Sequence, residues 1–384
     1  MGVRRRLAAL SLAAAASAAV ASPAGAEPDL AWGLAPIPEN KATSNLWDVA
    51  ATDATHAWAV GIEGYHPDQQ TAGGPMILQW DGIEWSRAPL PVTQVPVSFR
   101  RVAASSATDV WVVGGPRSQN IDDNVTLVWR YDGVTWTEVP YPAGATPSTL
   151  TIRDVSVVDG RVWLVGYRGN TPVFHEWTGE SWREHLPPSE CVNNGFPNFC
   201  TINSVKAFAP DNVWAAGNGM WSGFMGPLLF HWNGTRWRAV QVGVNGQPLT
   251  LNSIDGSSAK EIWAVGDSGG MGSGNIVVRG DGTTFGLVPG MNSPRVPGVA
   301  VGASGAPWVI GNLPPMPRAA FSTYRAGAWD SIPAPAPPNT LGATYNAITA
   351  VPGTDWMIAV GVADLPNTNP RLVQAVIAEY APGQ

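Results

Sequence analysis

The feature that most constrains this chain is a unit of about 50 residues that recurs seven times. Each copy contains a short segment such as Trp58-Ala59-Val60-Gly61, or a close variant of it. The glycines that end this segment lie about 45 to 53 residues apart, at Gly61, Gly114, Gly166, Gly217, Gly266, Gly311 and Gly361. A unit of this length cannot bury its apolar face alone, so successive copies must pack against one another.

Each copy holds four short runs rich in Val, Ile, Trp and Tyr, separated by Gly, Asp, Asn or Pro. Such runs predict strands, and four strands per unit at this period are typical of β-propeller blades. We therefore expect an all-β, seven-bladed β-propeller with four-stranded blades. The blade repeats begin near residues 46, 99, 152, 202, 251, 296 and 345.

The last copy predicts how the ring closes. It ends after Tyr380 without the fourth run, which in copy one begins at Trp85 and ends at Pro91. A matching run stands near the other end of the chain, from Trp32 to Pro38. We expect a strand within residues 30–38 to complete the seventh blade, because closure removes the unpaired sheet edges.

Copy two resembles a kelch repeat. It contains Gly114-Gly115, Tyr131-Asp132, Trp136 and Val139-Pro140-Tyr141-Pro142, although no other copy has the double glycine. From Trp32 to Tyr380 the chain is also similar to secreted bacterial propellers with repeated Asp-Val-Trp-Ala-Val-Gly and His-Trp-Asn-Gly-x-x-Trp motifs. The resemblance implies a propeller fold, but it says little about function, since propellers include lectins, scaffolds and enzymes.

Residues 1–26 have the pattern of an export signal. Arg4, Arg5 and Arg6 precede a small-residue apolar stretch, and Ala24-Gly25-Ala26 is a cleavage motif. We expect a mature, extracellular, monomeric chain with one propeller domain over residues 27–384. The sequence does not distinguish the general secretion route from the twin-arginine route.

The two cysteines, Cys191 and Cys200, enclose a short loop without His, Asp or Glu. This spacing in an exported chain predicts a disulfide, and we expect no metal site and no cofactor. Asp122 and Asp123 are paired acids in another loop, where calcium binding is an open alternative to simple solvation.

The 19 tryptophans are the most unusual part of the composition. Most recur in register on the second, third and fourth strands of the copies, which favours packing between blades over stacking on sugars. Trp221 falls outside this register, in a segment interpreted as a loop over residues 217–226. With Phe224, Phe196 and Phe199 it forms the first candidate binding patch, because aromatic residues with polar neighbours commonly anchor interfaces.

The second candidate site is the mouth of the central channel. Two residues before the recurring Val or Ile of each innermost strand stand Trp47, Arg100, Arg153, Asn203, Asn252, Pro297 and Asn346. Equivalent positions must form a ring around the axis, and arginine and amide donors suit an anionic or hydroxyl-rich ligand. Water filling a polar channel is the alternative reading.

The function predicted from these sites is non-catalytic recognition of a carbohydrate or a protein partner. With Lys+Arg 22 against Asp+Glu 29, the net charge of −7 gives no basic surface for nucleic acid. One alternative is a polysaccharide lyase or glycoside hydrolase at the channel mouth, with Arg100, Arg153 and Asp154 as participants. Another is a structural or assembly propeller.

Overall fold

The computed structural model describes residues 31–41, 43–66, 71–90, 97–116, 127–140, 150–168, 171–191, 200–221, 224–242, 249–268, 274–313, 318–366, 368 and 372–381. The predicted export signal, the acids Asp122 and Asp123, and the aromatic residues Phe196 and Phe199 lie outside these residues. In the described part of the chain, no helix has the length and apolar character needed to cross a membrane.

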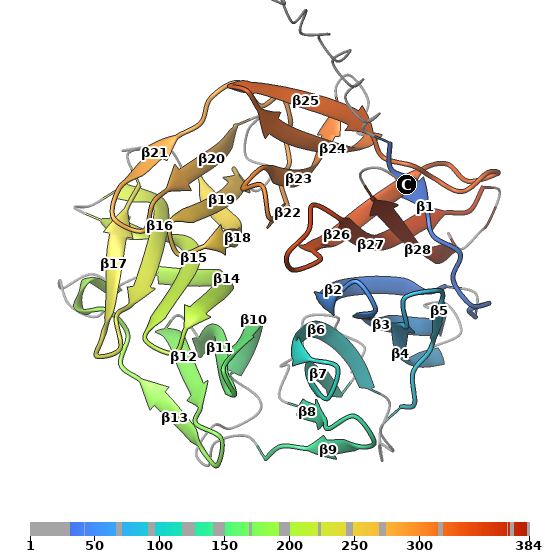
Figure 1. Cartoon of the computed structure of the whole chain (residues 1–384), viewed down its shortest axis with the longest axis horizontal. Helices are drawn as coiled ribbons and strands as arrows, with labels where there is room; N and C mark the ends of the chain where they lie inside the picture. Colours follow the sequence, from blue (N-terminus) through green and yellow to red (C-terminus); the bar gives the residue numbers. More distant parts are fainter. Residues whose placement is uncertain are drawn as a thin grey trace, which may run out of the picture.

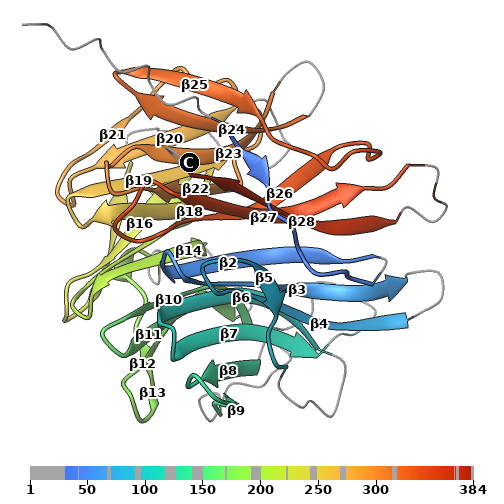
Figure 2. The same ribbon diagram turned by 45° about the vertical axis from the view of Figure 1, so that its right-hand side comes forward.

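Seven four-stranded antiparallel sheets surround a central channel (Figure 1), which confirms the predicted fold class. Neighbouring sheets stack face to face, as Figure 2 shows for the blades at the two ends of the chain. The innermost strands are β2 (Asn45–Asp53), β6 (Val97–Ser106), β10 (Leu150–Val158), β14 (Cys200–Ala209), β18 (Thr250–Ser258), β22 (Gly298–Val301) and β26 (Ala343–Ala350).

The second strands are β3 (His56–His66), β7 (Asp109–Pro116), β11 (Arg161–Arg168), β15 (Asn212–Trp221), β19 (Glu261–Asp267), β23 (Pro307–Leu313) and β27 (Met357–Asp364). The third strands are β4 (Thr71–Trp80), β8 (Leu127–Tyr131), β12 (Thr171–Trp177), β16 (Phe224–Trp232), β20 (Asn275–Gly280), β24 (Arg318–Arg325) and β28 (Val373–Tyr380). The outer strands are β5 (Trp85–Arg87), β9 (Trp136–Glu138), β13 (Trp182–His185), β17 (Trp237–Gln241), β21 (Phe285–Leu287), β25 (Ala328–Pro333) and β1 (Gly33–Leu34).

The N-terminal strand closes the ring as predicted. β1 pairs antiparallel with β28, with Gly33 opposite Glu379 and Leu34 opposite Ala378, and the two strands lie together in Figure 1. Trp32 is 8% exposed, and its ring stacks on Phe321 of blade six at 3.8 Å. The closing segment therefore both covers the edge of blade seven and packs against blade six.

The tryptophans of the second strands pack between blades, as their register predicts. Trp58, Trp111, Trp163, Trp263 and Trp308 are at most 1% exposed. The rings of Trp111, Trp163, Trp263 and Trp308 contact aromatic residues of the next blade along the chain. Trp111 meets Trp177 at 5.9 Å, for example. Because the wedge between two sheets is filled by these large rings, the tryptophan count reports the architecture rather than a ligand.

Aspartate–glycine pairs form the tight turns between the third and outer strands. Asp81 accepts backbone hydrogen bonds from Ile83 at 2.8 Å and Glu84 at 2.9 Å, while Gly82 has a φ of 94°. A positive φ favours glycine, since it lacks a Cβ. The same side-chain acceptor recurs at Asp132 and Asp281. The repeat therefore forms the same kind of turn in each of these blades.

The disulfide between Cys191 and Cys200 is present, with the two Cα atoms 5.7 Å apart. Cys191 ends a short 3-10 helix, η3 (Ser189–Cys191), and Cys200 begins β14. The bond therefore fastens the exit of blade three to the channel strand of blade four. A disulfide fits an extracellular protein, because oxidising compartments preserve such bonds.

The loop predicted over residues 217–226 is mostly strand. β15 continues to Trp221 and β16 begins at Phe224, with these two residues paired across the hairpin. The prediction failed because glycines and polar residues were read as a loop, whereas backbone pairing across a hairpin tolerates them. The side chains of Trp221 and Phe224 lie outside the description, so the aromatic patch stays a prediction.

Candidate functional site

The predicted ring of channel residues coincides with a repeated bulge. The pairing of the innermost strand with the second strand skips one residue in six blades, and the skipped residues are Trp47, Arg100, Arg153, Asn203, Asn252 and Asn346. The seventh position, Pro297, immediately precedes β22. A bulge leaves the extra residue outside the ladder, so these positions are released toward the channel.

The glycine of the repeat is required by this bulge. A Cβ added to Gly266 would lie 1.8 Å from the carbonyl oxygen of Thr250 on the neighbouring strand. Gly61, Gly166, Gly217 and Gly361 approach the equivalent oxygens as closely, at 1.9 to 2.0 Å. The strand backbones therefore come together where the innermost strand bends, and only glycine fits without displacement.

A cavity of about 570 Å³ lies at the channel mouth. Its lining includes Arg101, Arg153 and Arg295, together with the amides of Asn203, Asn252 and Asn346. One carboxylate, Asp267, also lines it. The fold thus gathers three guanidinium groups at one opening of a protein whose net charge is −7.

The ring amides are engaged between blades. Asn203 Nδ2 donates to the carbonyl of Leu251 at 2.9 Å. Asn252 Nδ2 donates to Val296 at 3.2 Å and Asn346 Nδ2 to Leu46 at 2.7 Å. In each case the acceptor belongs to the next blade around the ring. These amides hold neighbouring blades in register, a role that the sequence interpretation did not foresee.

The aromatic and cationic ring members also contact each other. The Arg100 guanidinium lies 4.6 Å from the centre of the Trp47 ring, and that of Arg153 lies 5.5 Å from the Tyr167 ring. A cation–π contact orients the Arg153 guanidinium group without using its N–H donors. Arg153 and Arg295 are exposed. Among the described residues, no carboxylate lies within ion-pair distance of either one.

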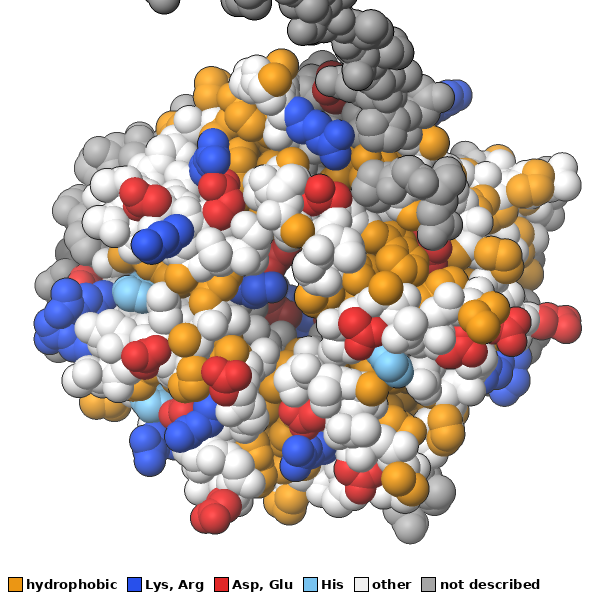
Figure 3. Space-filling model, in the orientation of Figure 1, with side chains coloured by type: hydrophobic (Ala, Val, Ile, Leu, Met, Phe, Trp, Pro, Cys, Tyr) orange, Lys and Arg blue, Asp and Glu red, His pale blue; other side chains and the backbone are white. Residues whose placement is uncertain are grey.

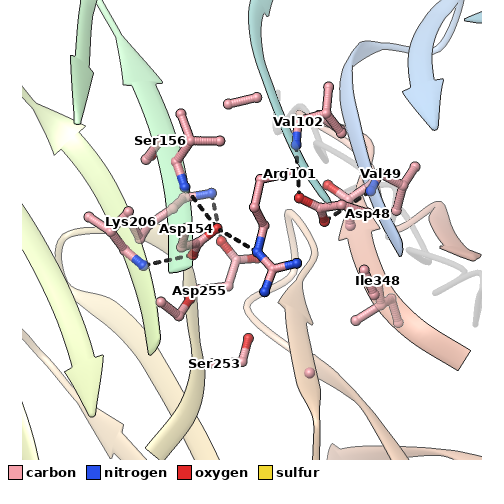
Figure 4. Close-up of a pocket in the computed structure, with 18 of the residues that line it drawn as sticks. Asp48, Val49, Arg101, Val102, Asp154, Ser156, Lys206, Ser253, Asp255 and Ile348 are labelled. Atoms are coloured by element: carbon pink, nitrogen blue, oxygen red, sulfur yellow. Dashed lines mark hydrogen bonds and ion pairs between the residues drawn. The ribbon is translucent and has the colours of Figure 1, made fainter. Parts of the chain in front are cut away.

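Deeper in the channel, the residue after each bulge forms a second ring (Figure 4). Asp48 accepts the backbone N–H of Val102 in the next blade at 3.0 Å, and Asp154 accepts that of Val205 at 2.8 Å. Ser204 and Ser253 accept the equivalent N–H groups of Ile254 and Val299. The alternation of side chains changes at the bulge, so sequence reasoning found the outer ring and, except for Asp154, missed this one.

Arg101 forms an ion pair with one acid of this second ring. It extends into the channel, where its Nε lies 3.9 Å from Asp154 Oδ1. Two residues further along the strands, Lys206 Nζ pairs with Asp255 Oδ1 at 2.6 Å. Charged side chains of both signs are visible in the central opening of the space-filling view (Figure 3). The channel is therefore lined by polar and charged side chains that bond to one another between blades.

The channel carboxylates are poorly solvated. Burial raises the pKa of Asp48 to about 7, a shift that Arg101 opposes and Asp154 increases. Burial likewise raises the pKa of Asp154, against the effect of Arg101. A low-dielectric setting disfavours the charged form of a carboxyl group. Both groups nevertheless accept backbone hydrogen bonds, so each has a structural role.

The Asp48→Asn variant is expected to unfold with a flatter pH dependence than the wild type. The folded-state pKa exceeds the ordinary value of 3.8, so the carboxyl group stabilises the fold at acid pH and loses this contribution as the pH rises through about 7. We expect the wild type to lose about 2 kcal/mol relative to the variant between pH 5 and pH 8. Urea unfolding at several pH values measures this difference, and parallel curves would contradict it.

No group of three or more His, Cys, Asp or Glu residues in the described part of the chain is arranged to hold a metal ion. The predicted lyase or hydrolase trio is only partly assembled. Asp154 lies in the channel with both oxygens accepting backbone N–H groups, those of Val155 and Val205. Arg100 and Arg153 are held against aromatic rings at the mouth.

Comparison with known proteins supports the fold. No protein-family model matches the chain, and no curated protein does. The structure of YCF48 bound to D1 peptide is similar with a TM-score of 0.55 and 14% identity, over 93% of this chain and 99% of the other. The propeller domain of the Trilobed protease from Pyrococcus furiosus, which has an open velcro topology, matches with a TM-score of 0.54 and 11% identity, over 88% and 94%.

A third solved structure is much longer than this chain. The GH74 xyloglucanase from Xanthomonas campestris matches with a TM-score of 0.58 and 13% identity, over 89% of this chain but 55% of the enzyme. At such low identities the likeness concerns the fold alone. The chain is thus similar to propellers with different activities.

Proposed function

We propose that this chain is a secreted recognition propeller that binds an acidic segment of a protein partner at its channel mouth. The observation that carries the proposal is the pair Arg153 and Arg295, exposed beside Arg101 in a cavity of about 570 Å³ and without a carboxylate partner among the described residues. Guanidinium groups bind carboxylates through paired hydrogen bonds. Because the chain as a whole carries a net charge of −7, an acidic segment is expected to prefer this local positive charge to other parts of the protein surface.

The mouth suits a polypeptide better than a sugar chain. Sugar rings need open aromatic faces, but the Trp47 ring is covered by Arg100 and the Tyr167 ring by Arg153. A peptide needs instead donors for its carboxylates and carbonyls, which the mouth supplies. The similar propeller YCF48 was solved with a D1 peptide, which is consistent with a peptide ligand here.

The finer parts of the proposal extend the same reading. We expect export through the signal over residues 1–26, a monomeric mature chain, and grouping with kelch-like secreted bacterial propellers. The disulfide between Cys191 and Cys200 supports the extracellular location. The aromatic patch of Trp221, Phe224, Phe196 and Phe199 is retained as an additional contact surface for the same partner.

A labelled polyglutamate peptide tests the proposal directly. We expect saturable binding by fluorescence anisotropy, weakened about tenfold or more in the Arg153→Gln/Arg295→Gln variant. The matched control is Arg236→Gln/Arg238→Gln, which removes the same charge from exposed positions of blade four and should bind like the wild type.

Four results would count against this function. Absence of peptide binding, or equal weakening in the control variant, would remove the channel mouth as the site. Tighter binding of a neutral or acidic polysaccharide would favour carbohydrate recognition instead. Release of sugar products by the wild type, lost in Asp154→Asn, would favour the enzyme alternative.

A further inference from the structure

A three-residue cluster recurs beneath the blade surface opposite the channel mouth. In blade two, Asp109 stands two residues before Trp111 and accepts its indole Nε1–H at 3.0 Å. The same Asp109 oxygen accepts from Arg130 Nε at 2.8 Å, and the Arg130 guanidinium lies 5.5 Å from the Trp111 ring centre. One carboxylate oxygen thus accepts hydrogen bonds from both the buried indole of Trp111 and the arginine that covers its ring.

Blades four and five build the same cluster with other residues. Glu261 accepts from Trp263 Nε1 and Arg279 Nε, both at 2.8 Å. Asn212 bonds Trp214 Nε1 at 3.1 Å and His231 Nε2 at 3.0 Å. In these three blades the acceptor stands two residues before the tryptophan, as the first residue of the second strand.

Blade six has the tryptophan and the cation but lacks the acceptor. The position two residues before Trp308 is Ala306. Trp308 is 1% exposed and Thr323, its partner across the strands, is fully buried. Neither Trp308 Nε1 nor Thr323 Oγ1 has a hydrogen-bond partner among the described residues. A buried polar atom left without a partner is costly, so the pair points to a missing acceptor.

Arg325 covers the Trp308 ring, although it stands two residues after Thr323, which holds the strand position of Arg130 and Arg279. The Arg325 guanidinium lies 5.7 Å from the Trp308 ring centre, as in blades two and five, and its Nη2 donates to the Tyr380 hydroxyl at 3.4 Å. No described carboxylate pairs with Arg325. Blade three also leaves its indole, Trp163, without an acceptor, but its arginine, Arg161, is paired with Glu176 at 2.9 Å.

A cavity of about 530 Å³ opens where the acceptor is missing. Ala306 and Arg325 line it, with the aromatic rings of Trp263, Tyr324 and Tyr380. The one acid in the lining, Asp355, is already bonded to the backbone N–H and hydroxyl of Ser304, at 3.0 and 2.8 Å. The cavity therefore offers a cation without a described carboxylate partner beside the partly exposed ring of Tyr324. Trp308, whose indole has no described acceptor, lies beneath Arg325 and does not line the cavity.

We propose that the blade-six cavity is a binding site for a sugar carboxylate, that is, a uronic acid unit. Its carboxylate pairs with Arg325, as Asp109 and Glu261 pair with the covering arginines of their own blades. The partly exposed ring of Tyr324 suits the apolar face of a sugar ring, and the phenol groups of Tyr324 and Tyr380 supply directed hydrogen bonds. This site is separate from the channel mouth and independent of the function proposed for it.

Titration calorimetry with galacturonate, galactose and N-acetylglutamate tests the site. We expect saturable binding of galacturonate, with galactose and N-acetylglutamate each at least about tenfold weaker. Arg325→Gln removes the cation and should weaken galacturonate binding by a similar factor. Ala306→Asp restores the cluster within the chain, so it should both abolish binding and raise the melting temperature.

The matched control is Arg130→Gln, which removes the corresponding cation from blade two. There Asp109 already pairs with the arginine, and Arg130 does not line the blade-six cavity. This variant should bind galacturonate like the wild type. No binding by the wild type, or unchanged binding in Ala306→Asp, would overturn the proposal. Equal binding of N-acetylglutamate would overturn the preference for a sugar, and loss of binding only in Arg153→Gln/Arg295→Gln would move the ligand to the channel mouth.

Discussion

A chain that lacks residues 31–38 is expected to lose its cooperative unfolding transition and to aggregate. The deletion removes β1, which exposes the backbone groups of β28 that now pair with Gly33 and Leu34. It also removes Trp32, whose ring fills the space between Phe321, Trp308 and Tyr380. The loss of one buried tryptophan alone costs about 3 to 5 kcal/mol, and an open sheet edge recruits other chains.

Thermal unfolding followed by circular dichroism, with size-exclusion chromatography, measures both effects. A synthetic peptide of residues 31–40 provides the specific control, because it should restore the transition by supplying the strand in trans. The same peptide with Trp32→Ala should restore it poorly. A truncated chain that stays monomeric with an unchanged melting temperature would show that β1 does not close the ring in solution.

Gly266→Ala is expected to destabilise the protein by about 3 kcal/mol or more, since inserted atoms in a well-packed region commonly cost this much. The new Cβ would lie 1.8 Å from Thr250 O and 2.7 Å from Leu251 Cα. Both are backbone atoms of the adjacent strand, so no side chain can rotate away. With an unfolding entropy near 2.1 cal/mol/K per residue, the melting temperature should fall by about 4 °C.

Gly286→Ala in the same blade is the matched control. Its added Cβ would have no neighbour within 4 Å, and alanine is somewhat better than glycine in a strand. Chemical denaturation should therefore show an unchanged or slightly higher stability. Equal losses in the two variants would mean that the bulge yields easily, and that the glycine of the repeat has another cause.

The channel mouth shows where sequence reasoning stops. Equivalent positions in a repeat must form a ring in a closed propeller, so Trp47, Arg153 and Asn203 could be placed together from the sequence. What each one contacts could not be known. Asn203 bonds the next blade, whereas Arg153 stays exposed at the cavity, and this difference depends on the spacing between blades.

The blade-six cavity is a second feature that the sequence alone does not reveal. Ala306 is unremarkable by itself, and an alignment of the copies shows only that it stands where other blades have a polar residue. It acquires meaning only beside Asp109 and Glu261, once their side chains are seen to satisfy a buried indole and a covering arginine. The signal in the sequence is the exchange of a hydrogen-bonding residue for alanine two positions before Trp308.

The sequence by itself determined the seven blades, the closing strand and the disulfide, because each follows from local patterns repeated at a fixed spacing. Because the pattern recurs in seven copies, a strand that is ambiguous in one copy is clear in the others. Strands that follow one another along the chain pair within a blade. Only the tertiary structure decided which polar groups are already satisfied and which are not. Hydrogen bonds between blades join residues about 50 positions apart. Only the closed ring therefore shows that Arg153, Arg295 and Arg325 have no carboxylate partner among the described residues.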